Sequence, residues 1–179
     1  AGWAGGLTSM DDRAFQAAKQ HGLTGERRVA DWLQRAGWYI IPSYDYTGSE
    51  GQKAPRIEGL ASKHILPDLD AARRGIRQWV EVKTKTRATF TYTTQRFEHG
   101  IPQRHWEEYQ QVQAITGCPV HLAIYEEETA VILLQRLDVL IPHARRSTMK
   151  KAGRDEGAMV YFPRDQFQVY RLDDSPHPA

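Results

Sequence analysis

Helical spacing of apolar residues marks two segments of the chain. Between Thr24 and Gly37 they recur at positions i, i+3, i+4 and i+7, namely Val29, Trp32, Leu33 and Ala36. This pattern predicts an amphipathic helix that ends at Gly37. A less regular helical stretch runs from Met10, and Gly22 predicts a break between the two stretches.

A further helix is predicted from Pro102 to about Thr116, because proline is favoured in the first helical turn and Gly117 supplies a stop. Apolar or alternating runs predict strands at 38–42, 65–72, 76–86, 119–126, 130–137, 158–162 and 167–172. The polar segment 43–62, rich in Gly, Ser and Pro, predicts a long loop, and such loops are more often functional than idle.

This order of elements (helix, strand, strand pair, helix, strand, strand) predicts one α/β domain with no internal repeat. We expect the domain to span residues 10–172. Residues 1–9 read as an expression remnant or a flexible lead, and residues 173–179 as a flexible tail. A chain of 179 residues is long enough to bury a core of this kind.

Composition narrows the class of protein. Hydrophobic residues make up 40% and charged residues 26%, which is typical of a soluble globular protein. The net charge is 24 − 22 = +2, too small to argue for or against a nucleic-acid partner. The single cysteine, Cys118, excludes a disulfide within the chain and fits a reducing, cytoplasmic setting. No apolar run approaches the roughly 20 residues of a membrane span.

Candidate chemistry comes from the segment LPDLDAARRGIRQWVEVKTKT. A turn centred between Arg74 and Gly75 would place Asp68 directly across from Glu81. Side chains alternate between the two faces of a strand, so Lys83 shares the face of Glu81. The register therefore predicts two acids and one lysine at one place.

Two interpretations of this acid pair stay open. Carboxylates about 5 Å apart repel by roughly 3 kcal/mol at an effective dielectric of about 20. A divalent cation such as Mg²⁺, which prefers oxygen ligands, would offset that repulsion. Alternatively, the hairpin is exposed and the side chains diverge into water, which spacing alone favours equally.

Two further features bear on the choice. Lys85 and Arg87 continue beyond Lys83 and predict a basic stripe suited to an anionic polymer. Glu26 lies on or beside the apolar face of its predicted helix, where a carboxylate needs a partner. For Glu26 the alternative is a first-turn glutamate that interacts with the helix dipole.

These residues resemble a known family. Pro67-Asp68, then Glu81-Val82-Lys83 after a hairpin, with a glutamate in the preceding GERRVADWL helix, resembles the PD-(D/E)xK nuclease superfamily. Its restriction-endonuclease-like fold, shared with archaeal-type Holliday-junction resolvases and many phage and defence nucleases, implies a central mixed β-sheet flanked by helices. The resemblance covers about residues 24–126.

The resemblance implies a role for each matching residue. Asp68 and Glu81 would hold a divalent metal together with the backbone carbonyl of Val82, and Glu26 would join them directly or through water. Lys83 would orient or help deprotonate the attacking water and stabilise charge on the phosphate. The metal would be Mg²⁺, with Mn²⁺ as a substitute, and either one or two ions fit three acids.

Nucleic-acid contacts are assigned to residues around this site. The candidates are Lys85, Arg87, Arg73, Arg74, His105 and Tyr109. His105 and Tyr109 lie in QRHWEEYQ, which departs from the glutamine–tyrosine pattern of exonuclease-type members. Aromatic residues at helical spacing, such as Trp106 and Tyr109, also suit a core. The basic run 143–154 suits either phosphate contacts or a solvated loop.

Other site chemistries find no support in the chain. The seven histidines lack zinc-ligand spacing, although His64 and His105 are the least safely dismissed. A G-x-S-x-G elbow and a Walker phosphate loop are both missing.

The sequence therefore predicts a metal-dependent nuclease that hydrolyses DNA, with 5′-phosphate and 3′-hydroxyl products implied by the resemblance. A homodimer is compatible with this prediction, and a membrane partner is not expected. Two alternatives remain: a nucleic-acid-binding module of the same fold that does not cut, and an interaction protein with a charged hairpin.

Overall fold

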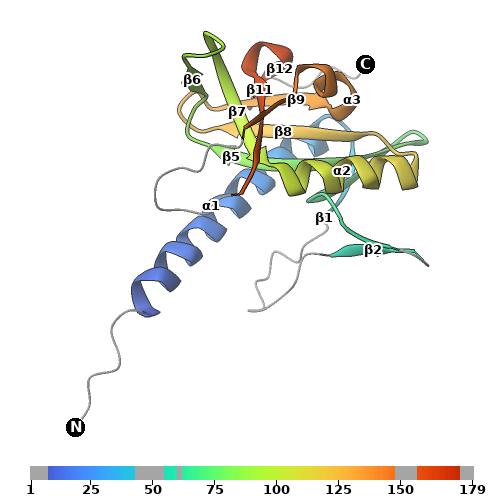
Figure 1. The fold of residues 1–179 in the computed structure, drawn as a ribbon. Coiled ribbons are helices and arrows are strands. Elements are labelled where there is room, and N and C mark those ends of the chain that lie inside the picture. The colour runs from blue at the N-terminus through green and yellow to red at the C-terminus, as the bar shows by residue number, and fades with distance from the viewer. Residues whose placement is uncertain (1–7, 43–54, 60–61, 148–156, 174–179) are drawn as a thin grey trace.

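A mixed six-stranded sheet forms the centre of the molecule (Figure 1). The computed structural model describes residues 8–42, 55–59, 62–147 and 157–173. In spatial order the strands are β1 (Tyr39–Pro42), β4 (Leu69–Arg73), β5 (Ile76–Lys85), β8 (Val120–Glu126), β9 (Val131–Arg136) and β12 (Gln168–Arg171). Only β5 and β8 run parallel; every other neighbouring pair in this sheet is antiparallel. The predicted α/β architecture is confirmed.

Two smaller sheets lie beside the main one. A four-stranded sheet has the order β10 (Arg145–Ser147), β11 (Met159–Pro163), β7 (Arg96–Pro102) and β6 (Thr89–Thr91). A two-stranded sheet pairs β2 (Arg56–Glu58) with β3 (Lys63–Ile65). The short helical elements are α3 (Leu137–Leu140), η1 (Ile141–His143) and η2 (Arg164–Gln166). Hydrophobic patterning predicted β11 but not β2, β3, β6, β7 or β10.

Helix α1 (Thr8–Arg35) is continuous, so the predicted break at Gly22 is wrong. Glycine lowers helix propensity by only about 1 kcal/mol relative to alanine, which neighbouring turns and tertiary packing can offset. Gly37, with φ of +81°, follows the helix as predicted, because glycine tolerates this left-handed conformation.

The apolar stripe of α1 covers one face of the main sheet. Val29, Trp32 and Leu33 are buried there, as the helical spacing predicted. They pack against side chains from three strands: Leu69, Ala71, Val80, Val82, Ala123 and Tyr125. Burying each large side chain contributes about 1.5–3 kcal/mol, so this contact fixes the position of α1 on β5.

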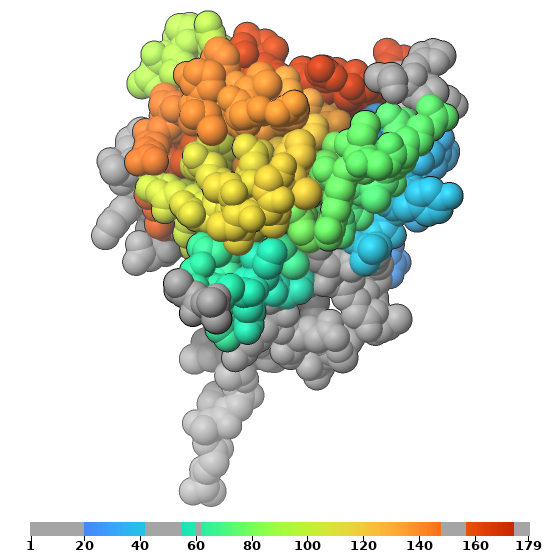
Figure 2. Space-filling view, turned by 90° about the vertical axis from the view of Figure 1, so that its right-hand side faces the viewer, coloured from blue at the N-terminus to red at the C-terminus, as the bar shows by residue number. Residues whose placement is uncertain are grey.

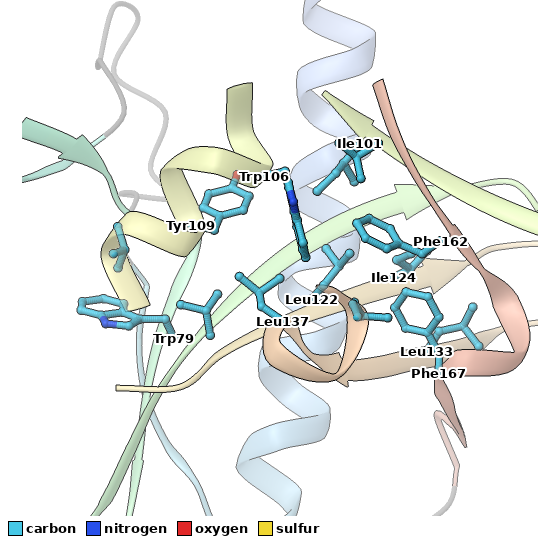
Figure 3. Close-up of a cluster of buried hydrophobic side chains, with 14 of the residues drawn as sticks. Trp79, Ile101, Trp106, Tyr109, Leu122, Ile124, Leu133, Leu137, Phe162 and Phe167 are labelled. Atoms are coloured by element: carbon cyan, nitrogen blue, oxygen red, sulfur yellow. The ribbon is translucent and has the colours of Figure 1, made fainter. Parts of the chain in front are cut away.

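Helix α2 (Gln103–Thr116) covers the opposite face, together with the four-stranded sheet (Figures 1 and 3). Its Trp106 ring lies 4.8 Å, centroid to centroid, from Phe162 of β11. The helix begins directly after Pro102 and ends at Gly117, whose φ of +66° allows its N–H to donate to the Gln113 carbonyl. Both predicted ends are therefore confirmed.

The β4–β5 hairpin has the predicted turn and register. Arg74 and Gly75 both have positive φ, 48° and 80°, as a two-residue type I′ turn requires. Arg73 pairs with Ile76, and the ladder runs outward to Leu69 and Val80. The next pair along the same count is Asp68 and Glu81.

A buried ionic network joins the two larger sheets at the end of β8. Glu126 accepts hydrogen bonds from Arg164, from Thr129 and, at 2.7 Å, from His99 of β7. Burial alone would raise the pKa of Glu126, but the bonds from Arg164 and His99 lower it to about 2. The carboxylate therefore stays charged and anchors the base of the β6–β7 hairpin.

None of the helices in the described part of the chain is long and apolar enough to cross a membrane. The predicted loop 43–62 lies mostly outside the described residues, as do most of the 1–9 lead, the 173–179 tail and the end of the basic run 143–154. Within that run, Arg145 donates to the buried Glu98.

Candidate active site

The site forms beside β5, at the position just before the start of β4. Antiparallel pairing with β4 covers β5 only up to Val80, whereas parallel pairing with β8 continues to Lys85. Beyond Val80, no strand among the described residues pairs with the β4-side edge of β5. Backbone groups there need other partners, because an unpaired buried amide is costly.

Asp68 supplies one of those partners. It directly precedes β4, and its Oδ2 accepts a hydrogen bond of 2.8 Å from the Val82 backbone N–H. The carboxylate thus takes the place of the strand carbonyl that would come next in the ladder. Asp68 is only 8% exposed, so the end of the ladder holds this acid at a buried position beside β5.

The carbonyl of Val82 faces the same opening. The Trp79 N–H donates to Pro119, and the Lys85 carbonyl accepts from Glu127, so the backbone groups of these odd-numbered residues point toward β8. Backbone groups of successive strand residues point to opposite sides. The N–H and C=O of Val82 therefore both point toward Asp68.

Glu81 and Lys83 follow the predicted alternation along β5. Val80 and Val82 are buried against α1, whereas Trp79 belongs to the core beneath α2. Glu81 and Lys83 thus lie on the α2 side of the strand. The Lys83 ammonium donates to Glu81, whose side chain is 2% exposed while that of Lys83 is 25% exposed. The ammonium is accessible at the rim and the acid is inside.

Helix α1 brings Glu26 to the same place. The preceding residue, Gly25, lies so close to β5 that a Cβ atom would be 1.9 Å from Oγ1 of Thr84. This close approach brings Glu26 near the edge of β5 beyond Val80, which β4 does not pair with. Among the described residues, its buried Oε2 has no hydrogen-bond partner. Burial, and to a smaller extent the nearby Glu81 carboxylate, raise the pKa of Glu26 to about 7, while the Lys83 ammonium opposes the rise.

The pKa of Asp68 is raised well above its usual range for the same reasons. Burial is the largest cause and the Glu81 carboxylate the next, while Lys83 and the Val82 amide lower it. Glu26 adds to the rise. The structure thus brings three carboxylates and one ammonium together, and the single positive charge does not balance three negative ones.

Helix α2 contributes His105 from the other side. Burial lowers the pKa of His105, and the nearby Lys83 ammonium lowers it further, while Glu81 opposes both. Its Nδ1 is buried without a hydrogen-bond partner among the described residues. The imidazole therefore faces the acid–lysine group as a neutral side chain.

Tyr109 and His64 have structural partners. Tyr109 is 3% exposed within the α2 core, with its ring centroid 6.1 Å from that of His105. This burial leaves it little surface for the predicted contact with nucleic acid. The ring Nδ1 of His64 lies 3.0 Å from Glu108, which also accepts a bond from the Ile65 N–H. That contact ties β3 to α2.

The predicted basic residues lie in two places. Arg73 and Arg74 are at the turn end of the β4–β5 hairpin, five residues or more along the strand from Asp68. The Arg73 side chain lies over the Trp38 ring and donates to the Ala36 carbonyl. Contact of these arginines with nucleic acid at the acid–lysine group would need a ligand that spans the hairpin.

Lys85 and Arg87 lie beyond Lys83 at the opposite end of β5. The Arg87 side chain is 74% exposed, and its guanidinium is 3.8 Å from Glu128. The pKa of His99 is lowered mainly by burial, and the positive charge of Lys85 lowers it further. Lys85 therefore lies near the buried network around Glu126. Their contact with nucleic acid stays a prediction.

Within the described residues, no group of three or more His, Cys, Asp or Glu side chains is arranged to hold a metal ion as it stands. Two of the acids already have protein partners: Glu81 accepts a hydrogen bond from the Lys83 ammonium, and Asp68 accepts one from the Val82 amide. Gly25 was not identified from the sequence as important for the site. The available signal was a glycine, the smallest residue, directly before Glu26 in a predicted helix.

The fold has a counterpart among solved structures. The Holliday junction resolvase Hjc of Archaeoglobus fulgidus matches with a TM-score of 0.51 and 14% identity, over 82% of this chain and 91% of the resolvase. The chain therefore has the restriction-endonuclease-like fold that the sequence resemblance implied.

A second solved structure, D212, a nuclease from a fusselovirus, aligns with a TM-score of 0.39 and 11% identity, a likeness too low to support an inference. It covers 94% of this chain and 90% of the nuclease. No protein-family model matches the chain, and no curated protein matches it significantly.

Proposed function

We propose that this protein is a metal-dependent nuclease that hydrolyses phosphodiester bonds in DNA. The observation that carries the proposal is the convergence of Glu26, Asp68, Glu81 and Lys83 beside β5, just before the start of β4. Buried like charges of this kind are costly in a purely structural role. Strongly raised acid pKa values next to a specific charge partner are typical of functional sites.

The residues fit a hard divalent cation such as Mg²⁺ or Mn²⁺. The donor set consists of oxygen atoms: the carboxylates of Asp68, Glu81 and Glu26 and the backbone carbonyl of Val82. Oε2 of Glu26 is buried without a protein partner in the described part of the chain, which leaves one acceptor for an ion or its water. Positive charge added here would offset the repulsion that raises the pKa values of Glu26 and Asp68.

The chain's own groups divide the work of hydrolysis. When bound, the metal supplies Lewis acidity and lowers the pKa of a coordinated water. Lys83, at the exposed rim, is placed to orient the attacking water and to stabilise charge on the phosphate. Neutral His105 faces Lys83 and can position it or donate to the substrate. The Val82 amide holds Asp68 in place, whereas Glu81 would exchange its contact with the Lys83 ammonium for the metal on binding.

The direct test is an incubation of the purified protein with labelled linear duplex, nicked, single-stranded and four-way branched DNA, each with Mg²⁺, Mn²⁺ or EDTA. We expect strand cleavage with either metal and none with EDTA, because the carboxylates need a cation to engage the phosphate. Binding of DNA without cleavage under every metal condition would instead establish the non-cleaving module.

The basic residues beyond the site allow a separate prediction. Replacing Lys85 and Arg87 with alanine should weaken DNA binding and reduce the slope of log K against log salt by about 1 for each lost phosphate contact. Titrations at several salt concentrations measure the slope. Arg136→Ala is the matched control, because Arg136 is also exposed and ion-paired but is the last residue of β9, opposite His121 near the start of β8 and far along the sheet from Lys85. An unchanged slope in the Lys85 and Arg87 variants would contradict the assignment.

A further inference from the structure

The β6–β7 hairpin carries a cluster of exposed aromatic rings. Phe90 and Phe97 are opposite each other in the ladder, with ring centroids 5.3 Å apart. Tyr92 lies 5.3 Å from Phe90 in an edge-on arrangement. The exposed fractions are 37% for Phe90, 56% for Phe97 and 81% for Tyr92. A contiguous exposed apolar patch of this kind marks an interaction surface.

The hairpin is close to the proposed site along the chain. Thr89, where β6 begins, is six residues after Lys83, so their Cα atoms are at most about 22 Å apart. At its other end β7 leads directly into α2, which carries His105. The hairpin lies at the top of the molecule in Figure 1 and again in Figure 2.

The exposed charge on this hairpin is positive. Between Arg87 and Pro102 the only carboxylate is Glu98, which is 3% exposed and bound by Arg145 and Thr94. The exposed ionic side chains are the arginines Arg87 and Arg96. A cleft of about 320 Å³ lies beside the Phe97 ring, lined by Gln95, Arg96, Phe97, Arg164 and Asp165.

We propose that the β6–β7 hairpin binds unpaired nucleotides of a DNA substrate by stacking bases on Tyr92, Phe90 and Phe97. Aromatic faces accept any base, and the arginines supply the phosphate contacts that a purely apolar surface lacks. The proposal rests on the proposed nuclease function and narrows its substrate to DNA with single-stranded character. The Glu126 network holds the base of the hairpin, so the rings are presented on a fixed support.

Binding assays in EDTA test the proposal without cleavage. The probes are a fluorescent oligothymidylate and a blunt duplex of the same length. Tyr92→Ala should lower affinity for the single strand about five- to tenfold and leave duplex affinity within about twofold. Tyr92→Trp, which keeps a large ring, should retain or tighten single-strand binding. Tyr39→Ala is the matched control, since Tyr39 is 80% exposed but lies on the edge strand β1.

The outcomes separate this proposal from the nuclease proposal. If the wild-type protein cleaves DNA but Tyr92→Ala binds the single strand as tightly as wild type, only the hairpin proposal is rejected. If the wild-type protein does not cleave DNA under any condition, but Tyr92→Ala lowers single-strand affinity and Tyr39→Ala does not, only the nuclease proposal is rejected. A surface for self-association would appear as a change in sedimentation of Tyr92→Ala without DNA, with affinity unchanged, and would also overturn the hairpin proposal.

Discussion

Replacing Asp68 with asparagine is expected to reduce DNA cleavage by about a thousandfold or more. Asparagine has nearly the same shape, and its Oδ1 can still accept the hydrogen bond from Val82. What it removes is the negative charge needed to hold a divalent cation, whose transition-state stabilisation amounts to several kcal/mol. Single-turnover cleavage with Mg²⁺ measures the loss.

The same variant should be more stable than the wild type without metal. The raised pKa of Asp68 reflects burial and repulsion from Glu81, both of which a neutral amide relieves. A gain of about 1 kcal/mol corresponds to a rise in Tm of roughly 2–4 °C for a chain of this size. Activity and stability thus move in opposite directions, which is typical of a functional residue.

Lys83→Ala should also reduce the cleavage rate, by at least about a hundredfold. Unlike Asp68→Asn, it should make the protein less stable. The ammonium is the positive charge that opposes the raised pKa values of Glu26 and Asp68. Without it, Glu81 loses its ion-pair partner and the carboxylates repel more strongly, so the Tm should fall.

Asp70→Asn is the matched control for these site variants. Asp70 lies two residues from Asp68 and is paired with Arg77 away from the site. We expect the control to cleave at the wild-type rate. Full activity in Asp68→Asn, Glu81→Gln or Lys83→Ala, in preparations free of contaminating nuclease, would reject the assigned site.

Gly25→Ala is expected to destabilise the protein by about 1–3 kcal/mol and to lower cleavage. The new Cβ would lie 1.9 Å from Oγ1 of Thr84 and 3.1 Å from its Cβ, so α1 must move away from β5. That movement displaces the adjacent Glu26 from the acid–lysine group. Denaturant unfolding measures the first effect, and cleavage with saturating DNA measures the second.

Two companion variants isolate the cause. Gly22→Ala lies one turn earlier on the same helix with nothing within 4 Å of the new Cβ, so it should stabilise the protein by about 0.5–1 kcal/mol. Adding Thr84→Ala to Gly25→Ala removes the colliding hydroxyl and should restore both stability and cleavage. If Gly25→Ala were as stable as Gly22→Ala, the close approach of α1 to β5 would not matter.

The β4–β5 hairpin was predictable because its signals are local. The two-residue turn at Arg74–Gly75 fixes the register, and alternation along β5 then places Glu81 and Lys83. Helical spacing likewise placed Glu26 at the edge of the apolar face of α1. The positions of these residues could be predicted without knowing which distant segments come into contact.

Other features depend on tertiary contacts that spacing does not encode. Pairing of β4 with β5 begins only at Leu69, which leaves the edge of β5 beyond Val80 to Asp68, and the preceding strand β3 is tied to α2 through His64 and Glu108. The strands β6 and β7 went unpredicted because their aromatic residues face solvent instead of a core. The helix α1 is continuous through Gly22 because a single glycine costs only about 1 kcal/mol relative to alanine, too little to interrupt a helix of 28 residues.

The hairpin register also limits which insertions and deletions the chain can accept. Because Asp68 and Glu81 are each a fixed count from the turn, adding or removing one residue in both arms moves only the turn and leaves them opposed. A change in a single arm slips the pairing by one and brings Val80 or Val82 opposite the aspartate. Natural variation in hairpin length is therefore expected to be symmetrical, with both arms growing or shrinking together.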